Sequence, residues 1–175
     1  MASVIQTQTP AVIQVVGFSK AGKTTLITKI IKEFKSRNLK VSILKSAKNH
    51  QYTYSKKDSD IFLENGAKIS TVVFQNAIQI TTNNEMSVER LIEIVQLLQP
   101  SDLILLEGFK NEGYTKILIW TEETKNNLEA FNFSGLCYVL NTTEAEVPQL
   151  TSEQHYKVFQ SQDELVHHLI KAIVE

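Results

Sequence analysis

The sequence lacks several features that mark specialised classes of protein. Its 175 residues include one cysteine, Cys137, so no internal disulfide can form. No apolar run approaches the roughly 20 residues that a membrane-spanning helix needs, and no basic start or cleavage site flanks the first apolar stretch. We therefore expect a cytoplasmic protein without a membrane partner. Cys137 lies in an apolar run, residues 136–140, and is interpreted as a core residue in preference to a catalytic thiol.

A strong charge of one sign is also absent. The chain has 18 Lys and Arg residues against 19 Asp and Glu residues, a formal net charge of −1, and its basic residues are scattered along the chain. This balance argues against nucleic acid as a partner. Histidine is sparse as well, and His50, His155, His167 and His168 do not form a metal-ligand pattern with cysteine. We therefore do not expect a structural zinc site.

A glycine-containing segment is the most informative feature that is present: Gly17-Phe18-Ser19-Lys20-Ala21-Gly22-Lys23-Thr24. It follows an apolar run, residues 11–16, and opens an amphipathic segment, which is the context of a P-loop. The glycines let successive backbone N–H groups curl toward a phosphate chain, and the next helix directs its positive end at the same anion. We expect Lys23 to reach the β and γ phosphates, Thr24 to ligate Mg²⁺ and Thr25 to extend the phosphate-binding segment.

Strand-like and helix-like segments alternate along the chain, which predicts an α/β fold with a mostly parallel sheet. The expected fold is a P-loop NTPase-type three-layer sandwich, with one nucleotide-binding domain over residues 1–175. Strands are predicted at residues 11–16, 41–44, 69–74, 77–81, 102–106, 116–120 and 136–140. The pair at residues 69–81 flanks a tight turn and is predicted to form an antiparallel hairpin insertion.

Helices are predicted between these strands from apolar periodicity and end signals. The first runs from the P-loop to near residue 38, and a short one covers residues 59–64. A third is capped by Ser87 and ended by Pro100. Ser161 and Glu164 form a capping box before the closing helix. Residues 45–57 are polar and show neither the helical nor the strand periodicity of apolar residues. They are predicted to form a long loop.

A second chemical signal is the apolar strand at residues 102–106, which ends in Glu107 and is followed directly by Gly108. This resembles a Walker B segment, in which an acidic group at a strand tip holds the hydration shell of Mg²⁺ or orients the attacking water. Glu107 is therefore the candidate metal-site and catalytic carboxylate. Asp102 lies at the other end of this strand, too far along an extended chain to share the site.

A third cluster, Lys57-Asp58-Ser59, ends the predicted loop and enters a helix. Asp58 or Ser59 can cap that helix. The loop also follows the second strand, and ligands of such sheets bind at the carboxyl ends of the strands, so Asp58 is equally a candidate for a second carboxylate near magnesium. Both alternatives remain open from the sequence. Residues 141–143, after the last predicted strand, are a positional candidate for contacting a base.

These motifs together resemble the MobB family of molybdopterin-guanine dinucleotide biosynthesis adapter proteins. The resemblance spans about residues 12–119 and rests on the P-loop, on Lys57-Asp58-Ser59 followed by Asn65-Gly66-Ala67, and on Leu106-Glu107-Gly108-Phe109-Lys110 with Lys116-Ile117 downstream. It implies a protein that binds GTP with Mg²⁺, hydrolyses it weakly, forms a homodimer and assists the guanylyltransferase MobA in attaching GMP to molybdopterin. Molybdopterin is then a bound substrate, and Lys110 is hypothesised to contact a phosphate or the pterin.

The chain departs from the family pattern at three places. The family has a histidine-rich segment that begins Lys-His after the second strand, where this chain has Lys45-Ser46-Ala47-Lys48-Asn49-His50. Lys56 replaces a usual glycine, and Thr115 replaces a usual proline. The P-loop and the Glu107 segment are intact.

The alternative from another class is a P-loop kinase that phosphorylates a small molecule or nucleotide with ATP. Such enzymes commonly hold the transferring group with lid arginines, because guanidinium matches phosphate oxygens bidentately. The arginines of this chain are Arg37 and Arg90, and both fall on predicted helices, Arg37 at the far end of the first. The scarcity of arginine favours the adapter, for which the missing arginine finger predicts slow hydrolysis. An adapter that binds nucleotide without turnover is a third alternative, which differs from the weak GTPase only in rate.

Overall fold

The structure is a computed structural model that describes residues 9–47, 58–144, 146–150 and 155–174. The chain divides into two compact units, which are described separately. The first unit comprises residues 1–46 and 92–175, and the second comprises residues 47–91. The described chain contains no helix long and apolar enough to cross a membrane.

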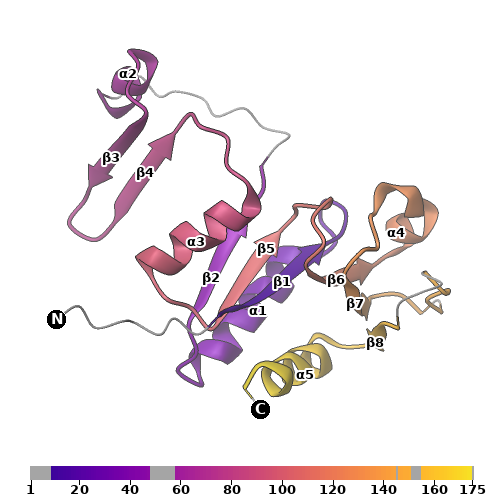
Figure 1. The fold of residues 1–175 in the computed structure, drawn as a ribbon. Coiled ribbons are helices and arrows are strands. Elements are labelled where there is room, and N and C mark those ends of the chain that lie inside the picture. The colour runs from indigo at the N-terminus through magenta and orange to yellow at the C-terminus, as the bar shows by residue number, and fades with distance from the viewer. Residues whose placement is uncertain (1–8, 48–57, 145, 151–154, 175) are drawn as a thin grey trace. The chain divides into compact units, whose positions relative to one another are not determined.

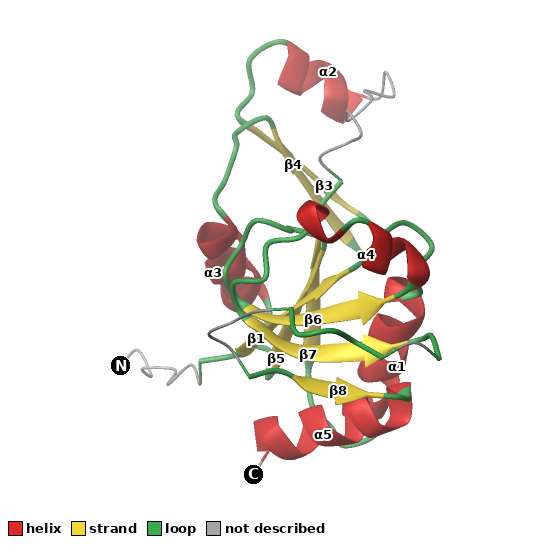
Figure 2. Ribbon diagram, turned by 90° about the vertical axis from the view of Figure 1, so that its right-hand side faces the viewer, coloured by secondary structure: helices red, strands yellow, loops and turns green. Residues whose placement is uncertain are grey.

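The first unit is built on a sheet of parallel strands. In the order of the sheet, they are β2 (Val41–Lys45), β5 (Leu103–Glu107), β1 (Ala11–Val16), β6 (Thr115–Trp120), β7 (Leu136–Asn141) and β8 (Lys157–Phe159). All five neighbouring pairs run parallel, and the common direction of β6, β7 and β8 is visible in Figure 2. The carboxyl ends of β1, β5 and β6 therefore meet at one edge of the sheet.

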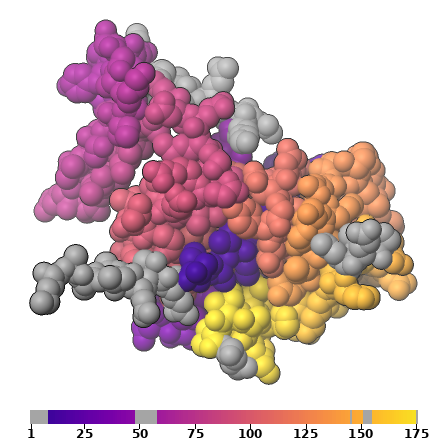
Figure 3. All heavy atoms as spheres, in the orientation of Figure 1, coloured from indigo at the N-terminus to yellow at the C-terminus, as the bar shows by residue number. Residues whose placement is uncertain are grey.

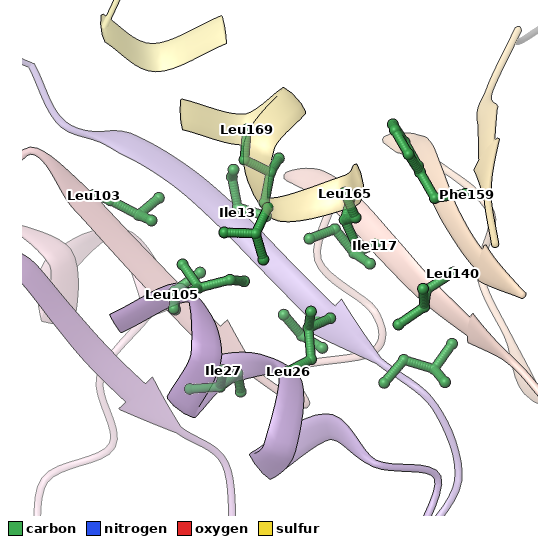
Figure 4. Close-up of a cluster of buried hydrophobic side chains, with 14 of the residues drawn as sticks. Ile13, Leu26, Ile27, Leu103, Leu105, Ile117, Leu140, Phe159, Leu165 and Leu169 are labelled. Carbon is green, nitrogen blue, oxygen red and sulfur yellow. The ribbon is translucent and has the colours of Figure 1, made fainter. Parts of the chain in front are cut away.

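Two long helices bury one face of this sheet. The helix α1 (Lys23–Lys35) directly follows β1, and α5 (Gln162–Val174) ends the chain (Figure 1). Their apolar stripes and the inward side chains of β1, β5, β6 and β7 form one cluster, part of which Figure 4 shows: Ile13, Leu26, Ile27, Leu103, Leu105, Ile117, Leu140, Leu165 and Leu169. The spacing of Leu26, Ile27 and Ile30 in the sequence is what places them on one face of α1.

The opposite face of β1 and β6 supports a second cluster, because successive side chains of a strand point to opposite faces. It contains Val16, Leu118, Trp120, Phe131, Leu136 and Val139. Phe131 comes from the segment that also contains α4 (Glu122–Asn126) and the short 3₁₀ helix η1 (Leu128–Ala130). Val16, the last residue of β1, belongs to this cluster, and the P-loop residue Phe18 packs against it.

The second unit consists of a short helix and a hairpin. The helix is α2 (Asp58–Glu64), and the strands β3 (Ile69–Val73) and β4 (Ile78–Thr82) pair antiparallel in a sheet of their own. The helix α3 (Val88–Leu98) begins in this unit and ends in the first. As predicted, Ser87 caps α3, since its Oγ accepts a hydrogen bond from the Arg90 backbone N–H at 3.3 Å.

The observed elements confirm the predicted fold class, a mostly parallel sheet with helices and a small antiparallel pair. Every predicted strand and helix is present, with ends shifted by a few residues. Three short elements were missed: β8, α4 and η1. Cys137 lies in β7 as expected, but it is half-buried and not a fully buried core residue. The single domain over residues 1–175 stays a prediction.

The first and last described elements of the first unit lie side by side. In Figure 3 the indigo atoms of β1 adjoin the yellow atoms of α5. A pocket of about 380 Å³ lies there, lined by residues 9–11 and 172–174 among others. Ala11 begins β1, so this pocket is at the end of the strand opposite the P-loop.

Candidate functional site

The P-loop joins the carboxyl end of β1 to the start of α1, as predicted. Gly22 is the residue before α1 and has a left-handed backbone with φ of 93°, a conformation that glycine adopts without strain. No side chain caps the helix, so the first backbone N–H groups of α1 are not used by a capping residue. Thr24 and Thr25 are exposed in this first turn. The arrangement suits an anion at the N-terminus of α1.

Lys23 lies within the curve of the P-loop. Its Nζ donates hydrogen bonds to the backbone carbonyls of Gly17, at 3.1 Å, and Phe18, at 2.5 Å. Burial lowers the pKa of Lys23, Glu107 opposes this effect, and the positive charges of Lys110 and Lys45 lower the pKa further. The charges of Glu107, Lys110 and Lys45 are therefore near enough to influence the protonation of Lys23.

Glu107 ends β5 next to the end of β1, where it pairs in register with Val15. Its side chain is 13% exposed, and Oε1 lies 3.2 Å from Nζ of Lys45, the last residue of β2. The backbone N–H of Ser46 donates to the Glu107 carbonyl at 2.9 Å. The predicted carboxylate thus stands at the carboxyl edge of the sheet beside the P-loop.

Lys110 lies near the same edge, three residues after Glu107. Its Nζ is 5.1 Å from the ring centroid of Phe18 and 4.9 Å from that of Phe131. The two rings meet edge to face with their centroids 5.1 Å apart. Aromatic faces attract a cation, so the rings hold the Lys110 ammonium against the P-loop residue Phe18.

The charges around the P-loop sum in favour of an anionic ligand. Lys45 pairs with Glu107 at 3.2 Å, and the charges of Glu107, Lys45 and Lys110 all act on Lys23. The positive end of the α1 dipole adds to these positive charges. Three ammonium groups against one carboxylate give a net positive site, which matches a phosphate chain accompanied by a divalent cation. The hydroxyl of Thr24 and the carboxylate of Glu107 are oxygen donors of the kind that Mg²⁺ prefers. Among the described residues, no group of three or more His, Cys, Asp or Glu side chains forms a metal cage.

The remaining P-loop residues shape the turn. Ser19 and Lys20 are exposed, and Lys20 has a positive φ of 61°. Ala21 donates its backbone N–H to the Phe18 carbonyl at 3.3 Å, which closes the turn. A side chain at Gly17 would come within 3.4 Å of the Ile119 Cβ. The loop therefore passes close to β6.

Asp58 is the first residue of α2 and is exposed, in the second unit. A carboxylate in the first turn of a helix is stabilised by the helix dipole. Asp58 and Ser59 are the first two residues inside α2, so neither takes the N-cap position that the capping alternative gave them. The role of Asp58 at magnesium stays a prediction. Residues 48–57, with His50, Lys56 and Lys57, lie outside the described residues.

Asn141, the positional candidate for base contact, is buried at the end of β7. Its Oδ1 accepts hydrogen bonds from the backbone N–H and the hydroxyl of Thr143, both at 3.0 Å. Thr142 donates its hydroxyl to the Trp120 carbonyl at 2.7 Å. These side chains form an ordered turn at the carboxyl edge of the sheet.

Lys116, one of the residues of the resemblance, has a structural role. It is 1% exposed, and its Nζ donates to the carbonyls of Glu112, Asn132 and Ser134 at 3.2, 2.7 and 2.9 Å. Burial lowers the pKa of Lys116, and the charge of Glu112 opposes this shift. The side chain thus fastens two irregular segments to β6.

Sequence reasoning missed three contributors to the site: Gln14, Lys45 and Phe131. Lys45 could have been found, because it follows the second strand at the edge where Glu107 was expected. Phe131 carried no signal, since its partner Phe18 is more than a hundred residues earlier. Gln14 could have been noticed, because a polar residue inside an apolar strand indicates a buried side chain with specific hydrogen-bond partners.

Comparison with known proteins identifies the family of this chain. Residues 12–140 match the family described as "Molybdopterin guanine dinucleotide synthesis protein B", or MobB. The chain is 31% identical over 156 residues to the probable molybdopterin-guanine dinucleotide biosynthesis adapter protein of Bacillus subtilis, covering 87% of this chain and 86% of that one. It is 34% identical over 113 residues to the adapter protein of Haemophilus influenzae, with 62% of each chain covered.

Solved structures support the same assignment. A crystal structure of Bacillus subtilis MobB superposes with a TM-score of 0.72 and 28% identity, covering 93% of this chain and 96% of that one. A MobB homologue from Bacillus stearothermophilus has a TM-score of 0.66 at 23% identity, with 93% and 97% covered, and shows the shared fold. From the matched family, the curated relatives and the superposition, the chain belongs to the MobB family.

Proposed function

We propose that this protein binds GTP with Mg²⁺ and acts as an accessory protein in molybdenum cofactor biosynthesis, where it assists MobA in attaching GMP to molybdopterin. The observation that carries nucleotide binding is the uncapped N-terminus of α1 with Lys23, Lys45 and Lys110 gathered around it. The pathway assignment is supported by the relatives, which are named as adapter proteins of molybdopterin-guanine dinucleotide biosynthesis.

Each residue of the site has a proposed role. The backbone of residues 17–24 cradles the phosphates, and Lys23 offsets their charge by exchanging its carbonyl partners for phosphate oxygens. Thr24 and Glu107 hold Mg²⁺, Glu107 through the hydration shell, and bound Mg²⁺ would neutralise charge on the phosphate oxygens. Lys110 contacts a phosphate or the pterin. Asp58 positions water or contributes to the outer shell of the metal.

The arginine pattern supports slow hydrolysis over kinase activity. Arg37 lies just beyond the last residue of α1, where its guanidinium pairs with Glu33 at 2.8 Å. The P-loop is at the other end of this helix, so Arg37 is not a finger residue. A transition state without such an arginine is expected to form slowly.

The proposed assembly is a homodimer formed through the hairpin of the second unit. Five large apolar side chains of β3, β4 and the connecting turn are exposed: Ile69, Val73, Phe74, Ile78 and Ile80. Among the described residues, β3 and β4 pair only with each other. A two-stranded hairpin with an exposed apolar surface is suited to pair with a second copy.

The experiment that tests this function is calorimetric titration with GTP, ATP and GDP, each with and without Mg²⁺. We expect Mg²⁺-dependent GTP binding that exceeds ATP binding, and slow release of phosphate. If ATP is preferred, the proposal of an accessory GTPase is wrong, and candidate phosphoryl acceptors should be screened. If neither nucleotide binds, the phosphate site itself is refuted.

A further inference from the structure

Gln14 is a polar residue in the middle of an otherwise apolar strand. It lies in β1 with none of its surface exposed. Its register neighbours are Leu106 on β5 and Lys116 on β6. A buried amide is costly unless its groups are hydrogen-bonded, so its partners indicate what it is for.

The side-chain amide of Gln14 binds the turn that follows Glu107. Its Nε2 donates to the carbonyl of Gly108 at 2.9 Å and also to the carbonyl of Phe109. Both residues have left-handed backbones, with φ of 88° and 53°. For Phe109 this conformation is uncommon, because a side chain disfavours it. The two carbonyls that Gln14 binds therefore belong to a turn that needs external support.

This turn sets the position of Lys110. Lys110 is the next residue, and its ammonium lies against Phe18 of the P-loop and Phe131. The turn also makes backbone hydrogen bonds, from Gly108 N–H to the Val15 carbonyl at 3.2 Å and from Glu112 N–H to the Phe109 carbonyl at 3.0 Å. Gln14 adds a side-chain connection between the turn and the central strand.

The other half of the Gln14 amide is also buried. Among the residues that the structure describes, its Oε1 has no hydrogen-bond partner. Lys116, its neighbour on β6, donates to three other carbonyls. Within the described chain, Gln14 therefore acts through the two hydrogen bonds that its Nε2 donates to the turn.

We propose that Gln14 is a positioning residue of the phosphate site, which holds the turn at residues 108–109 so that Lys110 stands beside the P-loop. The inference deepens the proposed function and rests on it for the identity of the ligand. Gln14 does not contact the phosphate or the metal itself. It acts by positioning Lys110.

A double-mutant cycle tests the coupling, with affinity for GTP and Mg²⁺ as the readout. Gln14→Leu should weaken binding about tenfold, the size of one charged hydrogen bond, and Lys110→Ala should do the same. The double variant should bind no more weakly than Lys110→Ala alone, because Gln14 acts through that lysine. Unchanged affinity in Gln14→Leu, or additive losses in the double variant, would overturn the proposal.

Amide hydrogen exchange tests the turn without a ligand. Gln14→Leu should speed exchange at the Gly108 and Glu112 amides. Ser101→Ala is the matched control. Ser101 lies just before the amino end of β5, and the substitution removes part-buried hydrogen bonds of its hydroxyl with the Ser42 hydroxyl, at 2.7 Å, and the Gln99 carbonyl, at 3.1 Å. It should leave both amides unchanged. If Gln14→Leu does not fold, Gln14→Met keeps the length of the side chain without its donor.

The two readouts separate the inference from the function on which it rests. If the wild-type protein binds no nucleotide, the proposed function fails and the phosphate part of the inference fails with it. Faster exchange at Gly108 and Glu112 would still show that Gln14 holds the turn. If the wild type binds GTP and exchange is unchanged in the variant, the positioning role alone is wrong.

Discussion

Lys23 illustrates how single residues of this site depend on their surroundings. In the sequence it is the lysine of a P-loop, and in the structure its ammonium is shared between two carbonyls of the same loop. Burial and two nearby lysines favour its neutral form, and Glu107 favours the charged form. A phosphate chain would favour the charged form further, so the lysine is held ready for an anion.

We predict that Lys23→Ala weakens binding of GTP with Mg²⁺ about 10- to 100-fold, the range of charged hydrogen bonds. The free energy of unfolding should change little, because the hydrogen bonds of Lys23 go to two carbonyls of the P-loop itself and not to a distant element. Lys29→Ala is the matched control on the same helix; Lys29 pairs at the surface with Asp163 at 2.7 Å. Calorimetric titration and urea unfolding measure the two quantities. A Lys23→Ala variant that binds as tightly as the wild type would refute the P-loop assignment.

Residue by residue, the site was only partly predictable. Lys23, Glu107 and Lys110 were identified from local motifs, and the structure brings all three to one edge of the sheet. Lys45 and Gln14 were missed because their roles depend on partners on neighbouring strands, which a local motif does not reveal. The roles at metal, phosphate and pterin stay predictions.

At the scale of elements, helices with clear apolar periods and caps agreed with the sequence. The predicted capping box before α5 is one such case for its N-cap half: the Ser161 hydroxyl accepts a hydrogen bond from the Glu164 N–H at 3.2 Å. The missed elements are short, and β8 spans only Lys157–Phe159. A strand of this length has too few residues to show a recognisable alternation of apolar and polar side chains. It is identified as a strand by its pairing with β7.

Ser161→Ala should lower the free energy of unfolding by about 1 kcal/mol, the usual effect of losing an N-cap. Leu165, Val166 and Leu169 of α5 lie in the main core. Fraying of this helix should therefore lower the stability of the whole fold. Urea unfolding monitored by circular dichroism measures the change. Ser36→Ala, at the exposed C-terminal end of α1, is the control. Equal stability of Ser161→Ala and wild type would show that the cap is not needed.

At the scale of the whole molecule, two predictions concern the second unit. The first is the role of Asp58. We expect Asp58→Ala to slow GTP hydrolysis severalfold if Asp58 positions water, with Glu64→Ala, at the other end of α2, as the control. Single-turnover assays with and without Mg²⁺ measure it. Unchanged turnover and Mg²⁺-dependent affinity would leave the favourable position of Asp58 in the first turn of α2 as the sufficient explanation.

The second prediction concerns assembly. Val73 and Ile78 face each other across the hairpin and are 74% and 67% exposed. Val73→Asp should shift a dimer toward monomer, because burying an unpaired carboxylate in an apolar interface is costly. Light scattering after size-exclusion chromatography measures the mass. Leu97→Asp, at an 81% exposed position of the first unit, should leave it unchanged. A monomeric wild type, or a dimer that persists in Val73→Asp, would contradict the hairpin interface.

The sequence by itself determined the elements and the motifs, because periodicity, caps and the P-loop spacing are local properties of the chain. It therefore predicted the α/β class, the MobB resemblance and the candidates Lys23, Thr24 and Glu107. The tertiary structure decided which distant residues meet: Lys45 beside Glu107, Phe131 beside Phe18, and Gln14 beneath the turn at residues 108–109. These contacts depend on strand order and register, which bring residues far apart in the chain to one edge of the sheet.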